Sequence, residues 1–283
     1  MKFLFGADVH GNKVQYEKIF SYAVDFGADV LCIAGDLTPK NPEQRTPRGQ
    51  RDFLKDYLLP AVSSIKEKVK VFLIMGNDDY KANYNFLLSN QNFGYVLLDN
   101  ASSVVDGYCF VGYTYVPYTP FKWKDWEKRD LASDTVDDLR ADTRFDGFLS
   151  TEKGDFIPYN ITEHMADDSI EFDLSSKIKG MSADKLVLVS HAPPYNTGCD
   201  YTKLKDGTFA HVGSRAVAKI IEKYQPLLTV HGHIHDAVGN TGVFPEKIGK
   251  TFCVSVSSDH VGDSPYVVYG DINNLSGMKR VKL

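Results

Sequence analysis

The sequence predicts an α/β protein in which two sheets pack together and helices cover the outside. Three observations predict this class. Over the first third of the 283-residue chain, short apolar runs alternate with helical patterns, which favours βαβ units and at least one parallel sheet. After residue 95, further strand-like runs follow, with a helical pattern between two of them. The composition, 43% hydrophobic and 24% charged, is typical of an ordered globular protein.

The N-terminal third contains three predicted strands and two predicted helices. The apolar runs predict strands at residues 2–5, 30–34 and 69–75. Apolar side chains recur at helical spacing over residues 13–26, which predicts the first helix. A similar pattern over residues 51–68 predicts the second helix, bent or broken near Pro60, because proline has no backbone N–H to donate.

The remainder of the chain is richer in strands. A hairpin is predicted from strands at 104–105 and 108–113 around Asp106-Gly107. A helix is predicted over residues 214–224. The other predicted strands are residues 185–190, 227–231, 251–256, 266–271 and 278–282. Because only short turns separate the last three strands, we expect them to form an antiparallel meander.

The composition also excludes several classes of protein. The formal net charge is -5, whereas a general polyanion binder has a basic excess, so we expect no extended nucleic acid as a partner. No apolar run approaches the ~20 residues of a membrane span, and the apolar start is too short for a signal peptide. The four cysteines are scattered without a Cys-x-x-Cys pair, which is typical of reduced thiols. We therefore expect a cytoplasmic protein.

One acidic segment differs from the rest of the chain. Residues 121–170 hold thirteen Asp or Glu against seven Lys or Arg. We interpret about 115–180 as a cap or insertion on a single domain that spans 1–283. Aromatic residues lie at its start, and two interpretations stay open for them: packing inside the cap, or a pocket that stacks on a nucleobase. These residues are Tyr113, Tyr115, Trp123 and Trp126.

Five short polar clusters contain the residues suited to chemistry, and each follows directly from a predicted strand. In open α/β sheets, ligands bind in the crevice beyond the carboxyl ends of the strands. The five strand ends therefore aim Asp, His and Asn side chains at one edge. The clusters are Asp8-Val9-His10, Gly35-Asp36, Gly76-Asn77-Asp78-Asp79, Ser190-His191-Ala192-Pro193-Pro194 and His231-Gly232-His233-Ile234-His235.

These side chains are suited to binding metal ions. Carboxylate oxygens mixed with imidazole nitrogens suit manganese, iron, zinc, nickel or similar ions, whereas all-oxygen sites favour magnesium or calcium. Seven such groups are too many for one ion and fit two ions that share a carboxylate. Two ions about 3.5–4 Å apart bind both oxygens of an in-line displacement and lower the pKa of a bridging water. This arrangement predicts phosphoester hydrolysis.

The five clusters resemble the motifs of the calcineurin-like metallophosphoesterase superfamily, which run Asp-x-His, Gly-Asp, Gly-Asn-His-Asp/Glu, His and Gly-His-x-His. The resemblance spans residues 3 to about 256 and implies a four-layer α/β/β/α sandwich of two mixed sheets flanked by helices. It implies two divalent metal ions and attack on phosphorus by a metal-bound hydroxide. The implied ligands are Asp8, His10 and His235 for the first ion, Asn77, His191 and His233 for the second, and Asp36 as the bridge.

Two positions depart from the family motifs or lie outside them. The family histidine after Gly-Asn contacts the phosphate and donates a proton to the leaving group, but this chain has Asp78 there. An aspartate with an ordinary pKa near ~3.9 is ionised at pH 7 and is a poor acid unless burial or neighbouring Asp79 raises its pKa. Two nearby metal cations would lower that pKa instead, so we expect no strong general acid from Asp78. Asn77 and Asp78 are the candidate catalytic residues. His231 lies outside the Gly-His-x-His match, and it either supports the ligands from behind or is an ordinary strand-end histidine near the site.

The sequence thus predicts a dinuclear metal-dependent phosphoesterase for a small phosphorylated substrate, nucleotide-like molecules included, with a diester slightly preferred over a monoester. The alternative is a scaffold or regulatory binding protein of the same fold with weakened catalysis. Asp78 favours that alternative, and the complete set of ligands disfavours it. Gly213-Ser214 precedes a predicted helix, where it could present backbone N–H groups to a phosphate or simply cap the helix.

Overall fold

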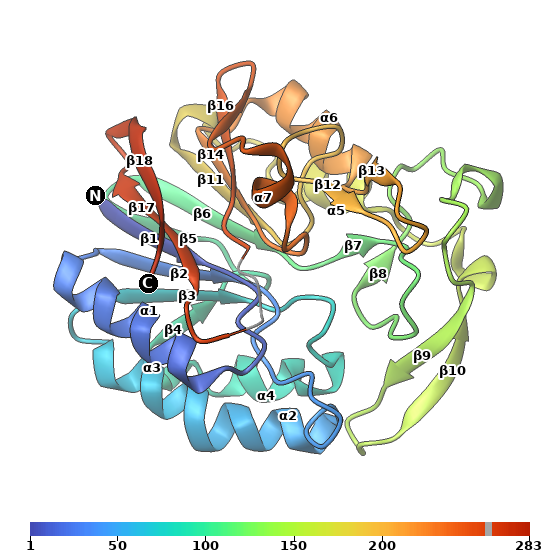
Figure 1. The fold of residues 1–283 in the computed structure, drawn as a ribbon, viewed down its shortest axis with the longest axis horizontal. Coiled ribbons are helices and arrows are strands. Elements are labelled where there is room, and N and C mark those ends of the chain that lie inside the picture. The colour runs from blue at the N-terminus through green and yellow to red at the C-terminus, as the bar shows by residue number, and fades with distance from the viewer. Residues whose placement is uncertain (258–261) are drawn as a thin grey trace.

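A computed structural model describes residues 1–257 and 262–283 of the chain. In this part of the chain, two six-stranded sheets lie face to face, and helices cover the outer face of each (Figure 1). The predicted four-layer α/β/β/α sandwich is therefore confirmed. The helices in the described ranges are all too short or too polar to cross a bilayer.

The first sheet has the strand order β18-β17-β1-β2-β3-β4. Strands β1 to β4 are parallel neighbours, and β17 is antiparallel to β1. Each of the first three strands is a short apolar run with both faces covered, as is usual for parallel strands. The bounds are β1 Lys2–Gly6, β2 Val30–Ala34, β3 Lys70–Ile74, β4 Tyr95–Leu97, β17 Tyr266–Asp271 and β18 Asn274–Lys282.

The second sheet has the strand order β15-β16-β14-β11-β6-β5. Its central strands β6, β11, β14 and β16 are parallel, and β5 and β15 are antiparallel edges. The bounds are β5 Ser103–Val105, β6 Tyr108–Tyr113, β11 Leu186–Ser190, β14 Leu228–His231, β15 Glu246–Ile248 and β16 Thr251–Ser255.

The predicted meander of the last three strands is wrong. Strand β16 pairs with β14 in the second sheet, whereas β17 and β18 form a hairpin in the first sheet. Apolar patterns identify strands but do not tell which of two sheets a strand joins. Burial along β16 is nearly continuous, as is typical of a central parallel strand, and this distinguishes it from the half-exposed β18.

Helices on the first sheet begin with α1, Lys13–Phe26, which Asn12 caps by accepting a hydrogen bond from the backbone of Gln15 at 3.1 Å. The predicted helix at 51–68 begins earlier, at Pro47. It widens into a π-helical turn just before Pro60, where the Leu59 N–H donates to the carbonyl of Leu54. The bounds are α2 Pro47–Phe53, the π-turn Leu54–Leu58, α3 Leu59–Ile65 and α4 Tyr84–Ser89.

The second sheet is covered by two helices, α5, Ile170–Lys177, and α6, Arg215–Tyr224. Apolar residues of both sheets form the central core, with Phe3, Phe72 and Phe110 among its fully buried members. The chain also forms α7, Ala237–Thr241, and a hairpin of β12, Tyr201–Lys203, and β13, Phe209–His211. Short 3-10 turns occupy Lys81–Asn83, Gln91–Phe93, Val136–Asp138, Ile161–His164 and Ala183–Lys185.

The acidic segment at about 115–180 lies beside one end of both sheets (Figure 1). Its strands are β7 Val116–Pro117, β8 Glu127–Lys128, β9 Asp146–Ser150 and β10 Phe156–Asn160. Inside it, the fully buried Lys124 ammonium pairs with the Glu127 carboxylate at 2.7 Å. Trp126 is 3% exposed and joins the core cluster beneath the first sheet. The segment therefore packs against the sandwich through Trp126.

Candidate metal centre

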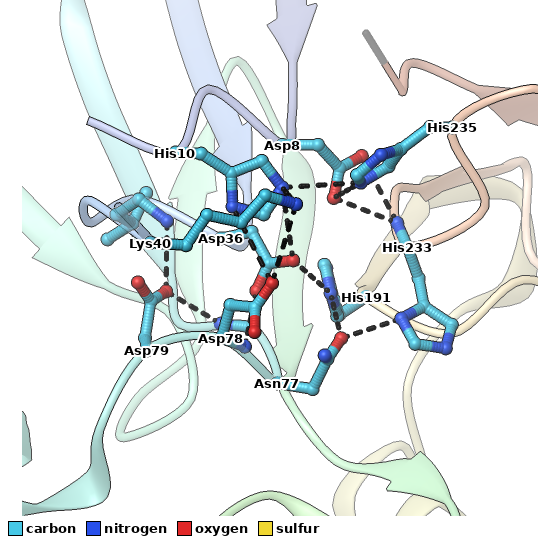
Figure 2. A network of polar contacts seen from close by, with 12 residues as sticks. Asp8, His10, Asp36, Lys40, Asn77, Asp78, Asp79, His191, His233 and His235 are labelled. Atoms are coloured by element: carbon cyan, nitrogen blue, oxygen red, sulfur yellow. Dashed lines mark hydrogen bonds and ion pairs between the residues drawn. The ribbon is translucent and has the colours of Figure 1, made fainter. Parts of the chain in front are cut away.

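The structure brings the ends of five strands together at one edge of the sandwich (Figure 2). Asp8 and His10 follow β1, Asp36 follows β2, and Asn77 follows β3, all in the first sheet. The second sheet contributes three histidines from loops that follow β11 and β14: His191, His233 and His235. All seven predicted ligands therefore belong to one cluster of side chains.

One group of four side chains is compact enough to hold a metal ion. Ligand atoms of Asp8, His10, Asp36 and His235 all lie within 4.8 Å of one another. The Nε2 atoms of His10 and His235 are 3.3 Å apart. Asp8 Oδ1 lies 3.6 Å from the Nε2 atom of His235. Imidazole and carboxylate atoms thus converge on one point.

A second group lies directly beside the first. Asn77 Oδ1 lies 3.1 Å from the Nε2 atom of His191 and 2.6 Å from the Nδ1 atom of His233. The Asp36 carboxylate belongs to both groups, because its Oδ2 atom lies 3.6 Å from Nε2 of His191 and also 3.6 Å from Nε2 of His10. The arrangement therefore consists of two donor groups that share one buried carboxylate.

The backbone at these positions is unusual. Seven non-glycine residues of the described ranges have a positive φ, and four of them are candidate ligands: Asp8 at 55°, His10 at 47°, Asp36 at 53° and His233 at 70°. A left-handed backbone is uncommon outside glycine, and such residues cluster at functional sites. Strands β1, β2 and β14 therefore end in sharp turns that direct polar side chains into the centre.

Two glycines allow the loops to approach one another. A Cβ on Gly76 would overlap the Asp36 carboxylate and would lie 2.8 Å from Cε1 of His191. A Cβ on Gly35 would overlap the His191 ring, and the φ of +99° at Gly35 is itself unfavourable for other residues. The Gly-Asp and Gly-Asn pairs in the sequence thus reflect close packing between strand ends.

The carboxylates in the centre are ionised. Burial by itself raises the pKa of Asp8, but His235 and His191 outweigh it and lower that pKa to about 2. Burial acts in the same direction on Asp36, and His191 and His10 hold its pKa well below the ordinary value. The centre therefore contains two buried negative charges: Asp8 in the first donor group and Asp36, which both groups share.

Two of the histidines are neutral, and the other two have raised pKa values. Burial lowers the pKa of both His10 and His233 to about 3, with Asp36 opposing the shift at His10 and His191 adding to it at His233. Burial also disfavours a charged His191, but Asp36 raises its pKa to about 9. Asp8 raises the pKa of His235 against the same effect of burial. A proton on the His191 ring would compete with a divalent cation for the same ring nitrogen.

His231 is fully buried and lies behind the centre. Its Nδ1 atom is 3.0 Å from the carbonyl oxygens of Ser190 and Ala192, the residues on either side of His191. Its Nε2 atom lies 2.8 Å from the Thr229 hydroxyl. Burial lowers the pKa of His231 to about 4, so the ring is neutral and donates from Nδ1. It ties the loop that carries His191 to β14.

Asp78 lies at the rim of the centre and forms an ion pair with Arg45. Its backbone N–H donates to the Asp36 carboxylate at 2.8 Å. Burial and the Asp36 charge raise the pKa of Asp78, whereas Arg45 and Lys40 oppose the shift. Lys40 and Arg45 belong to no recognisable motif, so neither cation could be identified from the sequence.

Asp79 is a structural residue whose role the sequence did not reveal. Its buried carboxylate accepts hydrogen bonds from the backbones of Leu37 at 3.0 Å, Thr38 at 2.8 Å and Gly76 at 2.9 Å, and from the Thr38 hydroxyl at 2.5 Å. Burial and Asp36 raise its pKa to about 7 despite these donors. The carboxylate joins the loop after β2 to the loop after β3.

We expect Asp79→Asn to destabilise the protein by about 1–3 kcal/mol, because the amide NH2 group replaces an acceptor and leaves buried donors unpaired. Urea denaturation measures this change. The control is Asp56→Asn, at an exposed position of the π-turn. Equal stability of the two variants would contradict the role given to Asp79.

A pocket of about 700 Å³ opens beside the centre. His233 and His235 line one end of it, and the acidic segment and the β12–β13 hairpin form other walls. The aromatic residues along this lining are Tyr118, Phe121 and Tyr195.

The four aromatics considered for a pocket are absent from the described lining of this one. Tyr113 is 4% exposed, and the Trp126 indole donates to the carbonyl of Asp79 at 2.7 Å. The rings of Tyr115 and Trp126 pack edge to face with centroids 5.2 Å apart, and Trp123 packs against Phe156 at 4.5 Å. For these four residues, packing is the interpretation that the structure supports.

Ser214 caps α6 by accepting a hydrogen bond from the backbone of Val217 at 3.0 Å. The Asp130 carboxylate accepts two more backbone hydrogen bonds there, from Arg215 at 2.7 Å and Ala216 at 3.3 Å. The end of α6 is therefore occupied by a carboxylate from the acidic segment. Of the two interpretations of Gly213-Ser214, the helix cap agrees with the structure.

A family model for calcineurin-like phosphoesterases matches residues 1–237. The chain therefore belongs to the calcineurin-like phosphoesterase family, as its motifs predicted. The uncharacterized protein MJ1162 of Methanocaldococcus jannaschii is 38% identical over 121 residues, which cover 42% of this chain and 49% of that protein. The match thus spans about half the length of this curated relative.

Solved structures share the fold over almost the whole chain. TT1561 of Thermus thermophilus superposes with a TM-score of 0.59 at 16% identity, covering 99% of this chain and 98% of that chain. A dimetal phosphatase from Danio rerio superposes with a TM-score of 0.52 at 13% identity, covering 95% and 92%. At these identities the likeness establishes the fold alone.

Proposed function

We propose that this protein is a phosphoesterase with two divalent metal ions, acting on a small phosphorylated substrate with a diester slightly preferred over a monoester. The observation that carries the proposal is the shared carboxylate: Asp36 lies 3.6 Å from both His10 and His191, which belong to different donor groups. Membership of the phosphoesterase family supports the same reaction class.

The donor chemistry fits divalent cations. Asp8 and Asp36 are ionised, and His10 and His233 are neutral with lone pairs available. Mixed oxygen and nitrogen donors suit manganese, iron, zinc or nickel. In this proposal Asp8, His10 and His235 would hold the first ion, Asn77, His191 and His233 would hold the second, and Asp36 would be shared by both. When bound, such ions neutralise the phosphate charge and lower the pKa of an attacking water.

The chain's own residues orient these donors. The Nδ1 atom of His191 lies 2.8 Å from the carbonyl oxygen of Ala34, which directs its Nε2 atom into the centre. The Asp8 carboxylate accepts a hydrogen bond from the backbone N–H of His233 at 3.0 Å and so holds the turn that carries His233. The acidic segment acts, in this proposal, as the cap of the domain, because it walls the pocket into which the leaving group would extend.

A metal and substrate screen tests the proposal. The protein is stripped with a chelator, reloaded with manganese, nickel, zinc or magnesium, and assayed on aryl phosphate monoesters and diesters while metal per chain is measured by elemental analysis. We expect two ions per chain and metal-dependent turnover. His233→Ala should lose one ion, and His164→Ala, a half-exposed histidine outside the centre, should lose none. Two bound ions without turnover of any ester would favour the scaffold alternative.

We expect the leaving group to control the rate strongly. Asp78 stands where the family has an acid histidine. Burial and Asp36 raise its pKa, but Arg45 and Lys40 favour its charged form, so we assign it no acid role. A positioned general acid contributes about 10²–10⁴-fold to a rate. Aryl diesters, whose leaving groups need no proton, should therefore be cleaved about 10²-fold or more faster than alkyl diesters. Parallel kcat/KM measurements on matched aryl and alkyl diesters check this expectation. Equal efficiency on both would contradict it.

A further inference from the structure

The loop that follows β2 brings a lysine into the metal centre. The Nζ atom of Lys40 lies 3.3 Å from Nε2 of His10 and 3.7 Å from Oδ2 of Asp78 (Figure 2). Its side chain is 25% exposed and lines the same pocket as His233 and His235. The ammonium group therefore faces both the donors and the space that a substrate would occupy.

The backbone just before Lys40 is held in place. Thr38 donates to the buried Asp79 carboxylate from its backbone at 2.8 Å and from its hydroxyl at 2.5 Å. The Gln50 amide donates to the carbonyl of Pro39 at 3.4 Å and to the carbonyl of Asp78 at 2.7 Å. Lys40 and Asp78 are thus fixed to each other through Gln50, so the lysine is preorganised, unlike a lysine on a free surface.

The second cation near Asp78 has a different position. Arg45 forms an ion pair with Asp78, but it does not belong to the described lining of the pocket, whereas Lys40 does. The Asp78 carboxylate therefore lies between an arginine that anchors it and a lysine that faces the pocket.

We propose that Lys40 contacts the phosphoryl oxygens of the substrate and that Asp78 is its positioning residue. The inference rests on the proposed function and names a residue for phosphate recognition in the same site. The family histidine that contacts the phosphate is replaced in this chain by an aspartate paired with Arg45, so a cation from another loop takes over that contact. A lysine ammonium is a compact positive charge suited to a phosphate oxygen, and hydrogen bonds between charged partners are stronger than neutral ones. Lys40 supplies charge stabilisation only, and no proton transfer is assigned to it.

Equilibrium binding of inorganic phosphate tests this assignment without turnover. Calorimetry on metal-loaded protein is compared for wild type, Lys40→Met and Lys40→Arg, with metal per chain measured on the same samples. We expect Lys40→Met to keep both ions and to weaken phosphate binding about tenfold to a hundredfold. Lys40→Arg should restore most of the affinity. The matched control is Lys55→Met, which removes an equal charge from an exposed position on the π-turn and should bind phosphate as wild type does.

A double-mutant cycle separates positioning from acid catalysis. Asp78→Asn should weaken phosphate binding less than Lys40→Met does. The double variant should bind phosphate as tightly as Lys40→Met alone, because Asp78 acts through the lysine. Wild-type phosphate affinity in Lys40→Met with both ions bound would overturn the proposal. So would a loss of turnover confined to Asp78→Asn. A wild-type protein that binds metal and phosphate but cleaves no ester would refute the proposed function. In that case, weaker phosphate binding by Lys40→Met would still support the phosphate contact.

Discussion

Asp36→Ala is expected to remove both metal ions together and to lower kcat by about 10³-fold or more. The reason is geometric: Asp36 Oδ2 lies 3.6 Å from Nε2 of His10 in one donor group and 3.6 Å from Nε2 of His191 in the other. Paired metal ions contribute several kcal/mol to stabilising the transition state, and each ~1.36 kcal/mol corresponds to a factor of ten. Elemental analysis of the purified variant and steady-state kinetics on an aryl diester provide the two measurements.

The contrast with His10→Ala makes this prediction specific. His10 belongs to the first donor group alone, so its loss should release one ion and leave the second. Asp56→Ala, at an exposed position, controls for the removal of one negative charge. Circular dichroism establishes that each variant is folded. A variant Asp36→Ala that retained both ions would exclude a shared carboxylate.

Gly76→Ala is expected to lower the stability of the metal-free protein by about 1–3 kcal/mol, as overpacking of a tight site does. The added Cβ overlaps both the carboxylate and the backbone nitrogen of Asp36, and backbone atoms cannot move aside as a flexible side chain can. Thermal denaturation after treatment with a chelator measures the effect, since each kcal/mol shifts Tm by about 2–4 °C in a chain of this class. Metal affinity should fall as well, because Asp36 must shift.

A second glycine provides the matched control. Gly239 lies within α7, and a Cβ there meets no atom within 4 Å. Gly239→Ala should therefore be neutral or stabilise the protein by up to about 1 kcal/mol, as alanine favours a helix. Similar losses of stability in both variants would mean that close packing at Gly76 is unimportant.

The position of the site could be predicted from the sequence because its signals are local. Each ligand stands within a few residues of an apolar strand, and parallel strands bring their carboxyl ends to a common edge. Asp8 and Asp36 follow neighbouring strands and could be placed together on this ground. Pairing of a strand with one of two sheets depends on contacts between distant segments, and so β16 was assigned to the wrong neighbours.

The surroundings of the site could not be predicted in the same way. Lys40 lies in a loop without periodicity, and its distance of 3.7 Å from Asp78 depends on two strand ends meeting in space. The short strands β9 and β10 have exposed and half-exposed residues, so their apolar pattern is weak. The Asp130 carboxylate caps α6 from a position more than 80 residues earlier in the chain, and no local sequence pattern predicts such a contact.

The centre lies across the seam between the two sheets. Asp8, Asp36 and Asn77 follow strands of the first sheet, whereas the histidines from β11 and β14 belong to the second. A cation held from both sides is a cross-link between polypeptide segments as far apart as His10 and His235, which are 225 positions distant. Loss of the ion would then weaken the connection between the two sheets as well as remove activity. Scarcity of metal in the surroundings would therefore also favour unfolding and degradation of the chain.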